Sequence, residues 1–298
     1  MDVGVLIPQG WTGEYDGWDP ARAWARTVWL AGQADALGFE SLWLFDHFHT
    51  VPVPTEEITF EAFTGLSALA AVTSRARLGH MVSCAGYRNP ALVAKMIATM
   101  DVISGGRIDL GIGAGWKQDE WVAYGYGFPS LRERQTRLRD ALEISHRMLR
   151  QVRSDYAGET ASVADAINVP QPLQRPSVPI VVGGNGQRVT WGLAAQFADE
   201  LNLDGMRTDD VREAMPIIAE RCREAGRDPA TLKVSVHWWA ERLPRDPRQL
   251  LEGYREAGVD RVMGLVRASA TDDDAFPALR AAAIDAGATF AEELAIAG

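Results

Sequence analysis

Residues 3–8 (Val-Gly-Val-Leu-Ile-Pro) and residues 41–45 (Ser-Leu-Trp-Leu-Phe) enclose a single helical segment, residues 21–37. The two short segments are almost wholly apolar, as parallel strands are when both faces of their sheet are covered. The longer segment spaces its apolar residues as a helix does, and Gly38 follows where a helix commonly ends. Together they predict a strand, a crossover helix and a second, parallel strand.

The same alternation continues along the chain. Further strands are predicted at residues 77–83, 108–113, 179–182, 198–203, 232–239 and 261–266. Further helices are predicted at residues 59–72, 90–103, 131–152, 188–197, 209–225, 247–257 and 272–286. Eight strand–helix units predict a (β/α)8 TIM barrel, a fold of typically ~250 residues.

No linker divides the chain, so residues 1–298 are predicted to form one domain. Residues 153–176 carry three prolines near their end and are predicted to be an irregular insertion after the long fourth-unit helix. A doubly wound parallel sheet is the alternative architecture. That fold has six strands in its usual form and gives the eighth predicted strand no role.

Composition excludes several classes of protein. Hydrophobic residues make up 47% of the 298 positions, which is too many for a disordered chain. The net charge of −10 disfavours nucleic acid as a partner. No apolar run reaches the ~18 residues of a membrane span, and the first ten residues lack the basic start of a signal peptide. Cys84 and Cys222 are isolated, which fits the reducing cytoplasm.

In a barrel of this kind, chemistry takes place at the carboxyl ends of the strands. The residues that follow or end the predicted strands are therefore the candidates for a site. They are Gln9, Trp11, Asp46, His47, Met81, Val82, Ser83, Cys84, Gly113–Trp116, Gly183–Gly186, Asn202, Trp238 and the segment that begins at Leu265.

Residues 46–49 (Asp-His-Phe-His) end the second strand and admit three interpretations. Two histidines in an HxH pattern can bind zinc, but the ends of the later strands do not supply the remaining ligands of a metallohydrolase. A second interpretation makes His47 a proton-transfer residue beside a redox cofactor, with Asp46 hydrogen-bonded locally. The third is structural, with an aspartate that caps a loop and a half-buried histidine. No metal site is predicted.

Two glycine-rich turns follow strands. Residues 111–116 (Gly-Ile-Gly-Ala-Gly-Trp) resemble a dinucleotide fingerprint, but the third glycine comes one position early, and close backbone packing explains them equally well. Residues 183–186 (Gly-Gly-Asn-Gly) lie between a strand and a helix, where backbone N–H groups can converge on a phosphate. A tight strand-to-helix turn is the alternative, and the absence of a lysine excludes a Walker loop.

Tryptophan is abundant, with ten residues in the chain. Most are expected in the core or at an interface. Aromatic side chains at the rim of a barrel can also wall a pocket for a flat ring. We therefore assign a substrate-binding role to Trp11, Trp116 and Trp238, together with Gln9.

Several motifs in this order resemble the bacterial-luciferase-like superfamily, and more narrowly its branch that depends on the deazaflavin coenzyme F-420. The similarity spans roughly residues 3–205. Its motifs are residues 44–48 (LFDHF), 78–82 (LGHMV), 87–95 (YRNPALVAK), 101–107 (DVISGGR), 111–116 (GIGAGW), Glu120, Tyr124-Gly125 and residues 183–186 (GGNG).

The resemblance implies roles for particular residues. Asp46 and His47 would border the deazaflavin ring, with His47 as the proton-transfer residue. The third strand would contain a bulge with a non-prolyl cis peptide at Met81–Val82, next to Ser83, and would back the ring. Gly183, Gly184, Asn185 and Gly186 would bind the phosphate. The implied activity is hydride transfer between coenzyme F-420 and a small organic substrate, with reduction of a C=C or C=N bond.

The sequence also departs from that pattern. A sugar-phosphate dehydrogenase of the branch has a glutamate where Trp116 stands, although Asp119 and Glu120 lie nearby. We find no matching set of basic residues for a sugar phosphate. An FMN-dependent luciferase-like monooxygenase with a partner reductase is one alternative function, and a non-catalytic flavin-binding relative is another. A basic rim that includes Arg88 or Arg188 would favour F-420. The resemblance further implies a cytoplasmic homodimer.

Overall fold

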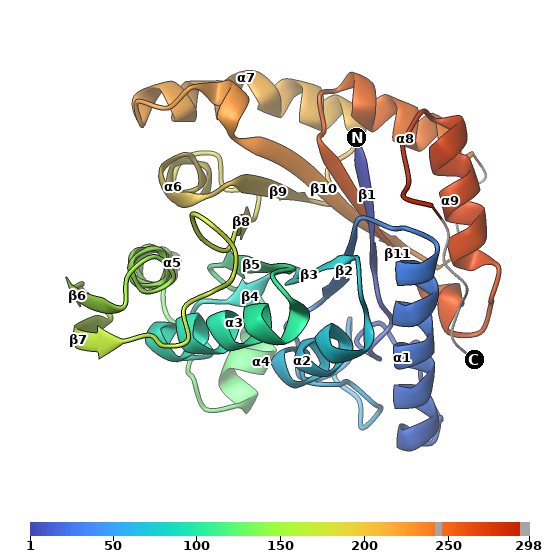
Figure 1. Cartoon of the computed structure of the whole chain (residues 1–298), viewed down its shortest axis with the longest axis horizontal. Coiled ribbons are helices and arrows are strands. Elements are labelled where there is room, and N and C mark those ends of the chain that lie inside the picture. Colours follow the sequence, from blue (N-terminus) through green and yellow to red (C-terminus); the bar gives the residue numbers. More distant parts are fainter. Residues whose placement is uncertain (242–245, 293–298) are drawn as a thin grey trace.

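A computed structural model describes residues 1–241 and 246–292 and shows eight parallel strands that close into a barrel (Figure 1). Each strand pairs with its neighbours in parallel, and β3 pairs with β5 to complete the ring. In order around the barrel the strands are β3 (Arg77–His80), β2 (Ser41–Leu44), β1 (Asp2–Leu6), β11 (Arg261–Val266), β10 (Lys233–Ala240), β9 (Glu200–Asp204), β8 (Ile180–Gly183) and β5 (Ile108–Gly113). The predicted (β/α)8 TIM barrel is confirmed.

Helices surround the barrel, one after each of the eight strands (Figure 1). They are α1 (Pro20–Ala36), α2 (Ala62–Val72), α3 (Pro90–Ser104), α5 (Leu131–Met148), α6 (Thr190–Phe197), α7 (Thr208–Glu224), α8 (Pro247–Glu256) and α9 (Ala275–Asp285). Short 3₁₀ turns occur at Pro229–Thr231 and Arg267–Ala270. No helix in the described part of the chain is long and apolar enough to cross a membrane.

The predicted start and stop signals of α3 are correct. The Asn89 side chain accepts hydrogen bonds from the backbone N–H groups of Ala91 and Leu92, and Pro90 occupies the first turn. Gly105 ends the helix in the left-handed conformation at φ 73°. In contrast, α2 begins three residues later than predicted, because the carboxylate of Glu61 accepts from the N–H groups of the first turn.

Two features of the insertion region differ from the prediction. Residues 153–176 are not wholly irregular: β6 (Arg153–Ala157) and β7 (Ser162–Ile167) form an antiparallel hairpin beside α5 (Figure 1). Asp140 of α5 stabilises the turn of this hairpin by accepting hydrogen bonds from Tyr156 and Thr160. A short helix, α4 (Gln118–Ala123), was not predicted, and no side chain caps its start.

The third predicted strand is split. It forms β3 and a two-residue strand, β4 (Ser83–Cys84), which pairs with β5. Between them the Met81–Val82 peptide bond is cis, as the family resemblance implied.

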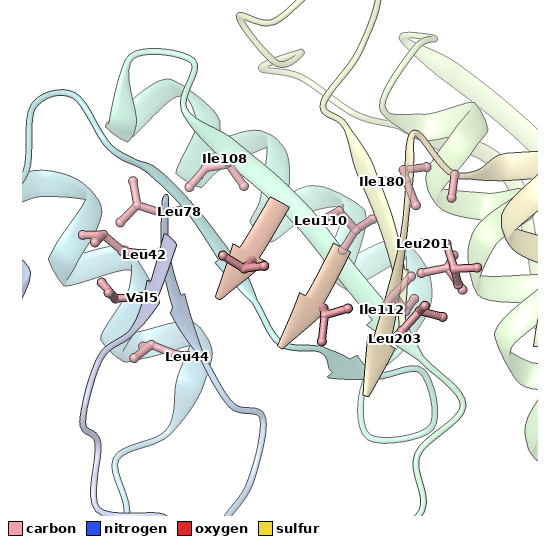
Figure 2. Close-up of a cluster of buried hydrophobic side chains, with 14 of the residues drawn as sticks. Val5, Leu42, Leu44, Leu78, Ile108, Leu110, Ile112, Ile180, Leu201 and Leu203 are labelled. Atoms are coloured by element: carbon pink, nitrogen blue, oxygen red, sulfur yellow. The ribbon is translucent and has the colours of Figure 1, made fainter. Parts of the chain in front are cut away.

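Alternate residues of the strands build two separate cores. Apolar side chains on the outer face of the barrel pack against the helices (Figure 2), and they include Val5, Leu42, Leu44, Leu78, Ile108, Leu110, Ile112, Ile180, Leu201 and Leu203. The other side chains fill the barrel itself. This inner cluster contains Leu6, Trp11, Trp43, Phe45, Met81, Val181, Met263 and Leu265.

Charged side chains close the amino-terminal end of the barrel. The buried guanidinium of Arg261 lies 3.2 Å from Asp109, 3.3 Å from Glu200 and 3.4 Å from Glu40. Burial raises the pKa of Glu200 to about 6, in spite of the opposing charge of Arg261. This end of the barrel is therefore filled by an ion cluster, which leaves the carboxyl end for a site.

Candidate functional site

The ends of β1 and β2 are joined by the side chain of Gln9. Its Oε1 accepts from the N–H of Phe45 at 2.7 Å, and its Nε2 donates to the carbonyls of Phe45 and Phe60, each at 2.9 Å. Gln9 is only 1% exposed. Its amide is thus used in fixing the segment that carries Asp46 and His47, and it positions the site.

His47 forms a hydrogen-bonded pair with Glu120 of α4. The distance from His47 Nδ1 to Glu120 Oε2 is 2.8 Å, and the Glu120 side chain is completely buried. Glu120 also accepts from the N–H of Phe48 and from the hydroxyl of Tyr87, each at 3.1 Å. Burial by itself would raise the pKa of Glu120, but these contacts, chiefly that of His47, lower it overall.

The pair sets the role of each imidazole nitrogen. A carboxylate can only accept, so Nδ1 of His47 carries the proton that it donates to Glu120. The other nitrogen, Nε2, makes no hydrogen bond within residues 1–241 and 246–292. His47 can therefore exchange a proton at Nε2 while Glu120 stabilises its charged form. His49 lies near the same carboxylate, with its Nδ1 3.9 Å from Oε1 of Glu120.

Aromatic rings surround His47. Trp11 stacks on the imidazole, with 4.1 Å between ring centroids and 4° between planes, and Trp116 approaches it edge-on at 5.9 Å. Trp11 is buried, whereas Trp116 is 61% exposed at the rim. The indole Nε1 of Trp11 is buried and has no hydrogen-bond partner among the described residues. The structure therefore places both of these predicted tryptophans next to His47.

The structure does not bring Trp238 into this group. Trp238 is buried in the outer core between barrel and helices, where its ring packs against the backbone at Gly264. Side chains alternate along a strand, so its neighbours His237 and Trp239 lie on the inner face of β10. The prediction that Trp238 binds substrate is wrong in register by one residue.

Asp46 serves the loop after β4. Its carboxylate accepts from the N–H of Cys84 at 2.9 Å and from both terminal nitrogens of Arg88, at 2.8 and 2.9 Å. Arg88 also pairs with Glu61 at 2.7 Å. The carboxylate of Asp46 is buried. Its partners come from the following barrel unit, so Asp46 is not hydrogen-bonded locally as the sequence predicted. Arg88 is committed to these contacts and does not form a basic rim beside residues 183–186.

The bulge at Met81–Val82 explains the glycines of two neighbouring strands. A Cβ atom on Gly113 or on Gly183 would lie 2.8 Å from the Val82 side chain. Ser83 is buried and its hydroxyl donates to the carbonyl of Gly111. Residues 111–116 therefore provide room for the bulge, as the packing interpretation predicts, and do not form a dinucleotide turn.

Residues 183–186 form the turn between β8 and α6. Gly184 has φ 129°, a conformation that residues with a side chain rarely adopt. Its N–H donates to the carbonyl of Asn202, and its carbonyl accepts from the indole of Trp191. The N–H groups of residues 185–187 donate to no acceptor in the described ranges, and Asn185 and Gly186 are exposed. The turn therefore presents free donors at the mouth of the barrel.

A cavity of about 700 Å³ lies between the barrel and the hairpin β6–β7. It lies between the loop at residues 85–90, α5 and the hairpin turn at residues 158–162. Tyr87 and Arg88 line it, but His47 and residues 183–186 do not. The His47–Glu120 pair and the aromatic rings around it therefore lie outside this cavity.

The family model for luciferase-like monooxygenases matches residues 1–240. The chain belongs to this family. An uncharacterized protein of Mycobacterium tuberculosis is 30% identical over 82% of this chain and 88% of its own length. The F420-dependent glucose-6-phosphate dehydrogenase of Kineococcus radiotolerans is 32% identical over 76% of this chain and 66% of its own length.

A solved structure shows the same fold. An F420-dependent secondary alcohol dehydrogenase, in complex with an F420–acetone adduct, superposes with a TM-score of 0.78 at 19% identity. That alignment covers 95% of this chain and 98% of the other.

Sequence reasoning missed several partners in this luciferase-like protein. Glu120, Tyr87 and Arg88 all lie in motifs that carried the family resemblance. Yet Glu120 contacts His47 across 73 residues, Arg88 contacts Asp46 across 42, and Tyr87 contacts Glu120 across 33. His237 was not among the predicted site residues. No group of three or more histidine, cysteine or acidic side chains is arranged to hold a metal in the part of the chain that the structure describes.

Proposed function

We propose that this protein is an F-420-dependent oxidoreductase that transfers hydride between the deazaflavin and a small organic substrate. Reduction of a C=C or C=N bond is the direction we favour. The observation that carries the proposal is the His47–Glu120 pair at the carboxyl end of the barrel, with Nε2 of the imidazole unoccupied. The relatives named as F420-dependent enzymes support the choice of cofactor.

The residues present fit such a cofactor. A phosphate would accept from the free N–H groups of residues 185–187, at a turn where a Cβ on Gly186 would lie 2.7 Å from the Thr190 hydroxyl. Arg188 follows this turn and is exposed, so it can meet the anionic glutamyl tail of F-420. Met81, Val82 and Ser83 would back the ring. A bound deazaflavin supplies hydride transfer only, without the ready oxygen chemistry of a flavin.

His47 completes the reaction with a proton. When the substrate accepts hydride at one atom of a double bond, the Nε2–H of His47 donates a proton to the other atom. In the reverse direction, Nε2 accepts the proton of an alcohol or amine as hydride leaves the adjacent carbon. In both directions Glu120 keeps Nδ1 protonated and orients the ring, so that one nitrogen alone exchanges protons.

The surroundings of His47 favour a neutral, partly apolar substrate. Trp11 and Trp116 supply apolar walls, with the unpartnered indole N–H of Trp11 as a hydrogen-bond donor. Lys117, which follows Trp116 in the sequence, is buried and paired with Asp119 at 2.7 Å. A sugar phosphate would need free cations in this place, so we do not propose one as the substrate.

The test of the cofactor is a pair of spectral titrations, with F-420 and with FMN, on the same preparation. We expect micromolar or tighter binding of F-420 and weaker binding of FMN. Equal or tighter binding of FMN would instead support a luciferase-like monooxygenase, the activity in the family's name. Binding of neither cofactor by the folded protein would overturn the proposed function.

A further inference from the structure

A second histidine, His237, lies inside the barrel near the proposed site. Its ring is 5.9 Å from that of Phe45, and Phe45 also lies 6.3 Å from His47. Neither the reaction proposed above nor the family motifs of the sequence use His237. Its side chain is only 13% exposed, so the imidazole is largely sheltered from water.

Both ring nitrogens of His237 are hydrogen-bonded to the end of β9. Nδ1 lies 2.6 Å from Oδ1 of Asn202, and Nε2 lies 3.1 Å from Oδ1 of Asp204. The Asn202 amide nitrogen donates to Ser235 Oγ at 2.9 Å, which leaves its oxygen toward the imidazole. An oxygen atom of β9 thus faces each of the two ring nitrogens. The hydrogen bond from His237 also lowers the pKa of Asp204.

The same two residues of β9 hold the glycine turn. The carbonyl of Asn202 accepts from the N–H of Gly184 at 3.0 Å. The side chain of Asn185 pairs with the backbone of Asp204 in both directions, since its Nδ2 donates to the carbonyl and its Oδ1 accepts from the N–H. The distances are 2.8 and 2.9 Å. A continuous set of hydrogen bonds thus runs from His237 through the end of β9 to residues 184 and 185.

We infer that His237 is a positioning residue for the phosphate end of the cofactor. By holding both Asn202 and Asp204, it fixes the end of β9 against which residues 183–186 adopt their shape. This inference rests on the proposed function, because it takes that turn as the phosphate site. It assigns His237 no contact with the cofactor and no proton transfer.

The first test measures the dissociation constant of F-420 for the parent protein and for variants of this set. His237→Leu removes both hydrogen bonds and should weaken binding about 10- to 100-fold, the range expected when charged hydrogen bonds are lost. His237→Gln keeps one donor and should restore part of the affinity. The matched control is Trp238→Phe, which lies on the same strand but faces the outer core, and it should bind F-420 like the parent.

A double-variant cycle separates positioning from general loosening of the barrel. Asn185→Ala cuts the same set of hydrogen bonds at its far end, so the double variant with His237→Leu should bind about as weakly as the weaker single variant. Fully additive losses, or unchanged binding in His237→Leu, would overturn the inference. Near-ultraviolet circular dichroism, which is sensitive to the many tryptophans, checks that each variant is folded.

A second measurement needs no cofactor. The chain has five histidines, so the ¹⁵N spectrum of histidine-labelled protein can be assigned with single variants. We expect the ring ¹⁵N signals of His237 to shift in Asp204→Asn and in Asn185→Ala, because both variants alter the hydrogen bonds to which this ring belongs. Signals of His237 that are insensitive to both variants would contradict the inference. If the parent does not bind F-420, the proposed function fails and this spectrum alone decides the role of His237.

Discussion

Two histidine–carboxylate pairs, His47–Glu120 and His237–Asp204, flank the ring of Phe45, and they are built in opposite ways. In the first pair the carboxylate is fully buried and one nitrogen of the imidazole is unoccupied. In the second the carboxylate is 62% exposed and both nitrogens are occupied. The same residue types therefore have different roles. The free Nε2 of His47 permits proton exchange, whereas the two occupied nitrogens of His237 fix the end of β9.

The largest effect should follow from removing the free nitrogen. His47→Ala should lower turnover by about 10²–10⁴-fold while cofactor affinity stays nearly unchanged, because a proton donor acts in the transition state and not in cofactor binding. Turnover is measured at saturating cofactor. His49→Ala is the matched control and should retain most of the activity.

In a third histidine, His80, neither ring nitrogen is hydrogen-bonded to a carboxylate among the described residues. His80 is fully buried and stacked on Phe63 at 4.0 Å, and burial lowers its pKa to about 4. The unfolded chain binds its proton near pH 6.5, so this residue should make the fold lose stability as the pH falls from 6.5 to 4. The expected loss is about 3 kcal/mol.

Denaturant unfolding of the parent and of His80→Leu across this range measures that loss. The parent should lose stability more steeply than the variant as the medium is acidified. The pKa of Glu200 is raised to about 6 and contributes with the opposite sign, but it is common to both proteins and cancels in the difference. Parallel curves for the two proteins would show that His80 does not titrate as described.

The buried carboxylate of the first pair is tested by Glu120→Gln. An amide can turn its N–H₂ toward Nδ1 and select the wrong tautomer, so turnover should fall about 10- to 100-fold with cofactor affinity preserved. Tyr87→Phe removes another partner of Glu120 without touching His47 and should cost no more than about threefold. Equal losses in the two variants would mean that Glu120 only supports the local fold.

The smallest effect concerns charge at the glycine turn. Gly184→Asp and Gly184→Asn share the backbone strain of a φ of 129°, so only the charge differs between them. The aspartate should bind cofactor about 10-fold more weakly than the asparagine, because its carboxylate repels a phosphate in a partly desolvated site. Equal dissociation constants would place the phosphate elsewhere.

The fold could be predicted because it follows from local patterns. Apolar strands, helical spacing and signals such as Asn89, Pro90 and Gly105 lie within a few residues of one another. The hairpin β6–β7 escaped prediction because its exposed strands lack a clear alternation of apolar and polar residues. The short α4 escaped because no capping side chain marks its start.

The site was predictable only in part. The family motifs led to His47 and to the cis bond at Met81–Val82, but not to the partners that give His47 its role. Glu120 reaches His47 across 73 residues, and no local pattern announces such a contact. The choice of Trp238 failed for a simpler reason. A one-residue error in strand register moves a side chain from the inner face of the barrel to the outer face.

One measurement tests most directly whether the two pairs have different roles. It determines the F-420 dissociation constants of His47→Ala, of His237→Leu and of the parent protein side by side. We expect binding by His47→Ala to stay within about threefold of the parent and binding by His237→Leu to weaken about 10-fold or more. A loss in His47→Ala as large as that in His237→Leu, or parental affinity in His237→Leu, would contradict it.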